Sequence, residues 1–259
     1  MFRIGLVSAT FRHLAPEEII AVAQAAGIEG LTWSGDVHVP LGQPDRACEV
    51  ARRTKDAGLE IEGYGSYYRA GCADGVQLFE RELEAVLALG APRIRVWAGT
   101  KESAVVTDRE RETIIEDLRR CGQTARQAGV TLAIEFHSHS LTDTAESTAA
   151  LMMALEGSGA RLYWQPPNGM PSGDAVAGLR KILPWVDHVH VFHWIVREGE
   201  LIRLPLSKGG EVWPGYLGVF AERPMPRWAL LEFVAGDDPK QFAADAQQLR
   251  DWLQSPGKC

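Results

Sequence analysis

The fold is decided by the segment RIRVWAGTKESAVVTDRERETIIEDLRRCGQTARQAGVTLAIEFH, residues 93–137. Its two ends, RIRVWAG (93–99) and TLAIEFH (131–137), are short apolar runs with few polar breaks, as expected of parallel strands covered on both faces. Between them, Thr107 and Glu110 form the pattern of a helix capping box, and Gly129 stands where a left-handed residue would end the helix. The segment therefore predicts one strand–helix–strand unit of a parallel sheet.

The same unit recurs along the chain. Eight β-like runs are present, at 2–10, 30–35, 59–66, 93–99, 131–137, 161–166, 186–192 and 227–234. Glycines that would end a helix recur about every 30 residues, the length of one strand–helix unit, at Gly27, Gly58, Gly90, Gly129 and Gly157. Helix starts are predicted at Pro16, at Asp143 as the capping residue, and at Asp238–Pro239. Residues 194–214 break the rhythm and are predicted to form a long loop over one barrel end, before a short helix near 215–222.

Eight such units in 259 residues predict an α/β fold, a single-domain (β/α)8 TIM barrel over residues 1–259. The competing architecture is an open doubly wound sheet. However, no glycine-rich phosphate-binding motif follows the first run, GLVSATF (5–11). No linker or low-complexity stretch divides the chain.

Composition and charge exclude several classes of protein. Hydrophobic residues make up 46% of the chain and charged residues 24%, which excludes disordered and fibrous classes. The formal net charge is -7 and no block of basic residues is present, which argues against a nucleic-acid or membrane-surface partner. The N-terminal run lacks the apolar core of a secretory signal, and no apolar stretch reaches the roughly 18 residues of a membrane span. The four cysteines (Cys48, Cys72, Cys121, Cys259) are scattered and are expected to be free thiols, and we expect a cytoplasmic protein.

Chemistry in such a barrel gathers at the carboxyl ends of the strands. The polar side chains expected there are Glu135 and His137 from the fifth run, Gln165 and Asn168 from the sixth, His188, His190 and His193 from the seventh, and Glu232 from the eighth.

The two glutamates need a counter-charge. Each lies in an apolar run, and burying a carboxylate without a partner is costly. No lysine or arginine is expected at these strand ends. A divalent metal would neutralise both glutamates, with His190 as the nitrogen ligand and the Gln165 amide oxygen as the fourth ligand. The alternative is a purely structural polar core, in which the histidines are hydrogen-bonded and Gln165 binds loop amides.

The chain resembles the xylose isomerase-like TIM-barrel superfamily of sugar-phosphate isomerases and epimerases. The resemblance lies in GLTWSGDVHVP (30–40), RIRVWAG (93–99), AIEFH (133–137), HVHVFHW (188–194) and ALLEF (229–233). In that superfamily a metal is held by Glu, Asp, His and Glu, which correspond to Glu135, Gln165, His190 and Glu232. Gln165 is thus a departure, because it offers an oxygen without a charge. The cofactor implied is one divalent ion, Mn2+ first, with Mg2+, Co2+ or Zn2+ as alternatives.

The resemblance further implies that Glu135 and Glu232 are catalytic, transferring protons on opposite faces of the substrate. Such a reaction proceeds next to a carbonyl through an enediolate, while the metal polarises the carbonyl. The residues expected around the mouth of the barrel, as substrate ligands, are Trp33, His38, Trp97, His137, Asn168 and Arg197.

The leading hypothesis is therefore a metal-dependent sugar or sugar-phosphate isomerase or epimerase with a small carbohydrate substrate. The first alternative is a lyase or dehydratase that uses the same site on a keto-sugar or polyol derivative. A non-catalytic sugar-binding protein is a further alternative. An endonuclease IV-like DNA-repair enzyme is disfavoured, because the charge is negative and the chain has only 7 histidines. A homo-oligomer is compatible with such a barrel.

Overall fold

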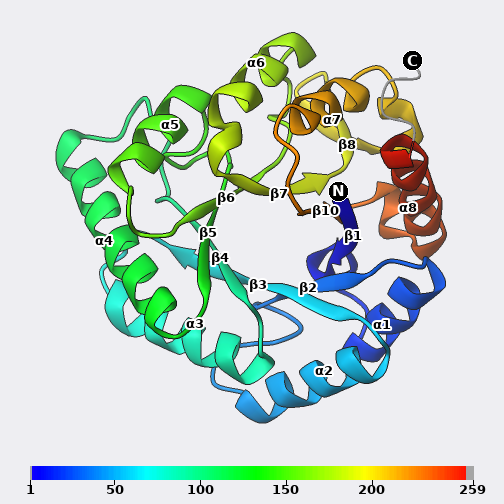
Figure 1. Cartoon of the computed structure of the whole chain (residues 1–259), viewed down its shortest axis with the longest axis horizontal. Coiled ribbons are helices and arrows are strands. Elements are labelled where there is room, and N and C mark those ends of the chain that lie inside the picture. Colours follow the sequence, from blue (N-terminus) through cyan, green and yellow to red (C-terminus); the bar gives the residue numbers. More distant parts are fainter. Residues whose placement is uncertain (1, 255–259) are drawn as a thin grey trace.

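The computed structural model describes residues 2–254, and these form a closed barrel of eight parallel strands surrounded by helices (Figure 1). The order around the barrel is β1-β10-β7-β6-β5-β4-β3-β2, so the last strand lies between β1 and β7. The barrel strands are β1 (Phe2–Val7), β2 (Gly30–Ser34), β3 (Glu60–Arg69), β4 (Arg93–Trp97), β5 (Thr131–Glu135), β6 (Arg161–Trp164), β7 (Val186–Val191) and β10 (Arg227–Leu231). The predicted α/β fold, a single TIM-barrel domain, is confirmed.

The helices cover the outside of the barrel and bury their apolar faces against the strands. They are α1 (Pro16–Ala25), α2 (Pro44–Asp56), α3 (Gly75–Leu89), α4 (Asp108–Gln127), α5 (Ala145–Ala154), α6 (Ser172–Ile182), α7 (Trp213–Ala221) and α8 (Pro239–Gln254). Short 3-10 turns are η1 (Ser8–Phe11), η2 (Leu183–Trp185), η3 (Leu206–Gly209) and η4 (Ala235–Asp237).

Most of the predicted helix starts and helix ends are present. The Thr107 hydroxyl accepts from the Glu110 amide, and the Glu110 carboxylate accepts from the Thr107 amide, which completes the capping box of α4. All five predicted helix-stop glycines adopt positive φ, 74° at Gly129. The prediction for α5 was one residue off, because Thr144 caps this helix. Asp143 instead accepts from the Ser103 amide at 2.9 Å.

The segment predicted as a long loop contains a hairpin instead. Strands β8 (His193–Arg197) and β9 (Glu200–Leu204) pair in antiparallel fashion directly after β7. The turn residues Glu198 and Gly199 have φ values of 52° and 83°, the left-handed backbone that two-residue hairpin turns need. Polarity alone predicted a loop, and the turn-forming pair Glu198–Gly199 was the missed signal. The short helix expected after it is α7.

A buried polar cluster occupies the barrel interior on the amino-terminal side of the strand ends. Its centre is Glu62, which lies 2.9 Å from Arg93 Nη1 and 2.8 Å from His188 Nε2 and accepts from the Tyr163 hydroxyl at 2.7 Å. Thr32 donates to the other carboxylate oxygen at 2.5 Å. Burial acts to raise the pKa of Glu62. His188 and Arg93 outweigh this effect and lower the pKa to about 2. Burial lowers the pKa of His188 below its usual value, and its ring is occupied by this buried polar cluster.

A second buried carboxylate, Glu82, lies on α3 and is 3% exposed. One of its oxygens accepts no hydrogen bond within the described residues. Burial raises the pKa of Glu82 to about 7, even though Tyr64 and the Tyr67 backbone stabilise the ionised form.

The remaining sequence expectations concern thiols and membrane spans. Cys48, Cys72 and Cys121 are free, as predicted, and Cys259 lies outside the described residues. Within residues 2–254, no helix is long and apolar enough to cross a membrane.

Candidate active site

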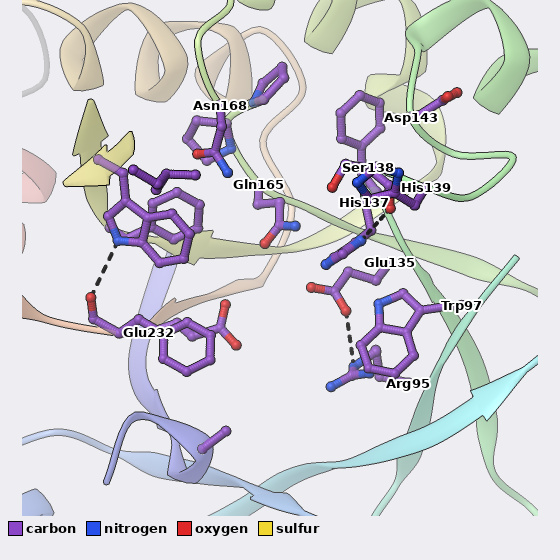
Figure 2. Close-up of a pocket in the computed structure, with 18 of the residues that line it drawn as sticks. Arg95, Trp97, Glu135, His137, Ser138, His139, Asp143, Gln165, Asn168 and Glu232 are labelled. Carbon is purple, nitrogen blue, oxygen red and sulfur yellow. Dashed lines mark hydrogen bonds and ion pairs between the residues drawn. The ribbon is translucent and has the colours of Figure 1, made fainter. Parts of the chain in front are cut away.

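A cavity of about 550 Å³ opens at the carboxyl ends of the barrel strands. Figure 2 shows Glu135, Gln165 and Glu232 directed toward the same space, from β5, from the segment after β6 and from the segment after β10. One side of the cavity is aromatic and is formed by Phe192, Trp194 and Phe233. Along the β3, β4 and β5 side, polar and aromatic side chains alternate: Tyr67, Arg95, Trp97, His137, His139 and Asp143.

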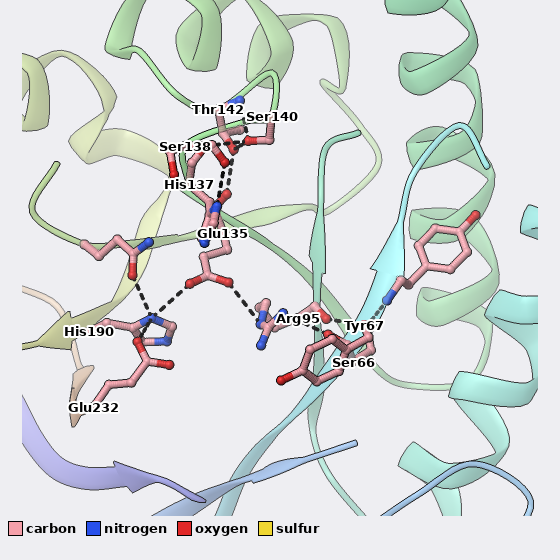
Figure 3. Close-up of polar contacts among 12 residues, drawn as sticks. Ser66, Tyr67, Arg95, Glu135, His137, Ser138, Ser140, Thr142, His190 and Glu232 are labelled. Atoms are coloured by element: carbon pink, nitrogen blue, oxygen red, sulfur yellow. Dashed lines mark hydrogen bonds and ion pairs between the residues drawn. The ribbon is translucent and has the colours of Figure 1, made fainter. Parts of the chain in front are cut away.

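The centre of the site is a buried cluster of Glu135, His190 and Glu232, in which one potential ligand atom from each residue lies within 4.8 Å of the others. His190 Nδ1 lies 3.3 Å from Glu135 Oε1 and 3.2 Å from Glu232 Oε2, and 3.5 Å from the Gln165 amide oxygen (Figure 3). Burial lowers the pKa of His190, but the two glutamates raise it well above its usual range. Oxygens of Glu135, Gln165 and Glu232 thus lie within 3.5 Å of one histidine nitrogen.

The glutamates are not equivalent, because Arg95 of β4 lies beside only one of them. Its Nε is 3.2 Å from Glu135 Oε2, while its Nη1 donates to the Ser66 carbonyl at 2.8 Å (Figure 3). Burial raises the pKa of Glu135, but Arg95 and His190 hold it well below its usual range. The expectation that no arginine lies at these strand ends was wrong. The signal was the alternation in RIRVW, which points Arg93, Arg95 and Trp97 to the barrel interior.

The four predicted ligands fit a divalent ion. The chemistry of the set, three oxygens and one nitrogen, suits Mn2+ or Mg2+ better than a thiolate-lined structural zinc site. Glu135 Oε2 is buried and makes no hydrogen bond with good geometry to any described residue, so it retains a free lone pair. Gln165 contributes no charge, and Arg95 offsets part of the charge of Glu135, so the site is less negative than its carboxylates alone suggest.

Three of the predicted substrate ligands line the cavity. Trp97 is 7% exposed, and its indole N–H finds no acceptor among the described residues, so it is an unused donor. His137 packs edge-on against Trp97, and its Nδ1 lies 2.6 Å from the Ser138 carbonyl. Nδ1 must therefore carry the proton, which leaves Nε2 as the second functional atom. Asn168 lies on the rim, in the segment after β6 (Figure 2).

The other three predicted substrate ligands lie elsewhere, and their assignment is corrected. Trp33 is fully buried and donates to Thr54 on α2, so it packs on the outer face of the barrel. His38 is 1% exposed and bonds the Ser8 hydroxyl at 2.9 Å, within the loop that follows β2. Arg197 is exposed at the end of β8 and does not line the cavity. The order of the strands does not show whether a side chain points into the barrel interior or outward, beneath a helix.

Comparisons with known proteins identify the family of this barrel. A 3-dehydroshikimate dehydratase of Bacillus anthracis is 26% identical over 197 residues, which are 73% of this chain and 70% of the relative. Among solved structures, a probable 3-DHS dehydratase from Bacillus anthracis superimposes with a TM-score of 0.80 at 20% identity, covering 96% of this chain and 99% of that one. A D-psicose 3-epimerase does so with a TM-score of 0.74 at 16% identity, covering 99% and 100%. The family model described as xylose isomerase-like TIM barrel matches residues 20–255, and the chain belongs to this family.

Proposed function

We propose that the protein is a divalent-metal-dependent lyase that removes water from a small polyhydroxylated carbonyl compound. The proposal rests on the buried Glu135–His190–Glu232 cluster and on the relative that is a dehydratase, which is 26% identical over 73% of this chain. It reverses the order of the two sequence hypotheses, in which isomerisation came first.

The observation that carries the choice is the position of Arg95 beside Glu135 and not beside Glu232. An epimerase that takes a proton from one face and returns it from the other needs two carboxylates that can each hold the proton. A guanidinium 3.2 Å from Glu135 favours its ionised form and so disfavours that role. Elimination needs only one carboxylate base, and among residues 2–254 no arginine forms an ion pair with Glu232.

The metal would be held by Glu135, Gln165, His190 and Glu232, and when bound it would polarise the substrate carbonyl. Glu232 takes the proton from the carbon next to that carbonyl. The carbon–oxygen bond at the neighbouring carbon then breaks, and the electron pair of the broken carbon–hydrogen bond forms the new double bond. In its doubly protonated form, His137 keeps the Nδ1 proton on the Ser138 carbonyl and donates the Nε2 proton to the departing hydroxyl, so that water leaves and the ring becomes neutral. Trp97 offers its indole N–H to a substrate oxygen.

Epimerisation or isomerisation is the second candidate. It is favoured by the placement of Glu135 at the end of β5 and Glu232 directly after β10, each within 3.3 Å of His190 Nδ1. A cavity of this kind, with an aromatic wall facing a polar one, suits a small carbohydrate in either reaction.

The test is to incubate the Mn2+-loaded protein in heavy water with 3-dehydroshikimate and a panel of keto-sugars. Dehydration gives a conjugated product, visible by ultraviolet absorbance, and releases one water per turnover. Epimerisation returns a substrate-mass product that carries deuterium. Deuterium uptake without loss of water would overturn the lyase in favour of the second candidate, and no change in any compound would favour a binding protein.

A further inference from the structure

Phe233, the residue directly after Glu232, has an unusual backbone. Its φ is 48°, in the left-handed region that non-glycine residues seldom adopt. Such a conformation costs free energy and persists only where surrounding contacts enforce it. Because the strained residue adjoins a member of the catalytic cluster, whatever holds Phe233 also orients Glu232.

Both backbone groups of Phe233 are held by side chains. Its amide donates to the Thr10 hydroxyl at 2.9 Å, and its carbonyl accepts from the Trp194 indole N–H at 3.3 Å. Glu232 itself is fixed on the other side, where its amide donates to the Val191 carbonyl at 3.1 Å. Thr10 is 2% exposed, so its hydrogen bond to the Phe233 amide is shielded from water.

Trp194 connects the turn to the β8–β9 hairpin. It stacks on Phe192, with ring centroids 4.3 Å apart, and pairs across the hairpin with Arg203. The Arg203 guanidinium lies over the rings of Trp194 and Phe233, at 5.5 and 4.8 Å, and forms an ion pair with Asp237. The hairpin is thereby fastened to the segment after β10.

We infer that Trp194 is a positioning residue for Glu232: its N–H holds Phe233 in the left-handed turn that directs the Glu232 carboxylate toward His190. Trp194 stands four residues after His190, and Phe233 stands one residue after Glu232. A single hydrogen bond therefore links the segments that follow two members of the cluster. The inference rests on the proposed metal site, because metal affinity is what the position of Glu232 would set.

The experiment titrates the purified full chain with Mn2+ by calorimetry. Substrate is left out, so that a contact between the Trp194 ring and the substrate cannot change the measured affinity. Trp194→Phe keeps an aromatic ring and removes the N–H, and it should weaken Mn2+ binding by about 10-fold, the lower end of the range for residues that orient metal ligands. Trp185→Phe, the same change before β7 at the opposite end of the barrel, should leave the affinity unchanged. Adding Phe233→Asn to Trp194→Phe should restore most of the affinity, since asparagine tolerates the left-handed region.

Each result decides something. Equal Mn2+ affinity for Trp194→Phe and wild type would overturn the positioning role alone. A loss that Phe233→Asn does not rescue would also overturn it, because the turn would not be what Trp194 holds. A wild-type chain that binds no Mn2+ would overturn the metal site of the proposed function and this inference with it. If circular dichroism shows that Trp194→Phe does not fold, Thr10→Val, which removes the other bond to Phe233, is judged by the same criteria.

Discussion

Replacing Glu82 by glutamine should stabilise the protein at alkaline pH and leave it unchanged at acidic pH. Glu82 is a carboxyl group on α3 that is 3% exposed and has one oxygen without a hydrogen-bond partner among the described residues. Glutamine has nearly the same shape, and it carries no charge at any pH. The substitution therefore removes the cost of ionisation and preserves the packing.

The size of the effect follows from the pKa. Burial raises the pKa of Glu82 from 4.5 to about 7, so the folded state holds a proton that the unfolded state has released. The corresponding stability is fully present below pH 4.5 and is lost as the pH rises through 7. At about 1.4 kcal/mol per pKa unit, the loss reaches about 3 kcal/mol at pH 8. In a chain of this size each kcal/mol changes Tm by about 2–4 °C.

The assay is urea unfolding of wild type and Glu82→Gln at pH 4 and at pH 8. The two proteins should have similar free energies of unfolding at pH 4, and the variant should be more stable by up to about 3 kcal/mol at pH 8. Glu80→Gln, at an exposed position of the same helix, is the matched control and should show no such difference. If Glu82→Gln were less stable than wild type by the same amount at both pH values, ionisation of Glu82 would not destabilise the protein, and the reasoning would be refuted.

Three further predictions concern the site. Glu232→Gln keeps an oxygen ligand but loses its charge, so it should still bind Mn2+, with lower affinity, and the Mn2+-saturated variant should lose about 10²–10⁴-fold in turnover, measured by product absorbance. Glu135→Gln should chiefly weaken Mn2+ binding, and a fully active Glu232→Gln would contradict its role as the base. Gln165→Asp should tighten Mn2+ binding by adding a charge, and Gln165→Leu should weaken it; calorimetry showing equal affinity for Leu and Gln would mean that the side chain is no ligand. His190→Ala should remove most of the bound metal, measured by elemental analysis, while His188→Ala should chiefly lower Tm. Equal metal losses in the two variants would mean that the wrong histidine had been assigned as the ligand.

The barrel was predictable because its signals are local. Most strands are short, mainly apolar runs, and the five predicted helix stops are glycines with positive φ, such as Gly129. The hairpin β8–β9 was missed because its turn, Glu198–Gly199, lies in a polar stretch that resembles a loop. Apolar runs and glycine stops do not depend on the rest of the fold, so a single sequence is enough to locate them.

The site was predictable only in part, for a geometric reason. Glu135 and Glu232 could be selected because a carboxylate in an apolar run demands a partner. Which partner arrives depends on the rotation of each strand about its own axis. That rotation brings Arg95 to Glu135 and carries Trp33 away toward α2. The unused indole donor of Trp97 and the strained backbone of Phe233 exist only in three dimensions, so the sequence pattern carries no sign of them.

The strand order has a consequence for how the chain folds. Because β10 lies between β1 and β7, Phe2 pairs with Arg227, and the ring cannot close until almost the whole chain is available. Before then, β1 and β7 each present an open edge of unpaired amides and carbonyls, which favours association with other chains. Contacts so distant in sequence are slow to form. Glu232 follows β10 directly, so barrel closure and completion of the Glu135–His190–Glu232 cluster are one event, and a chain interrupted during synthesis before β10 cannot assemble the cluster at all.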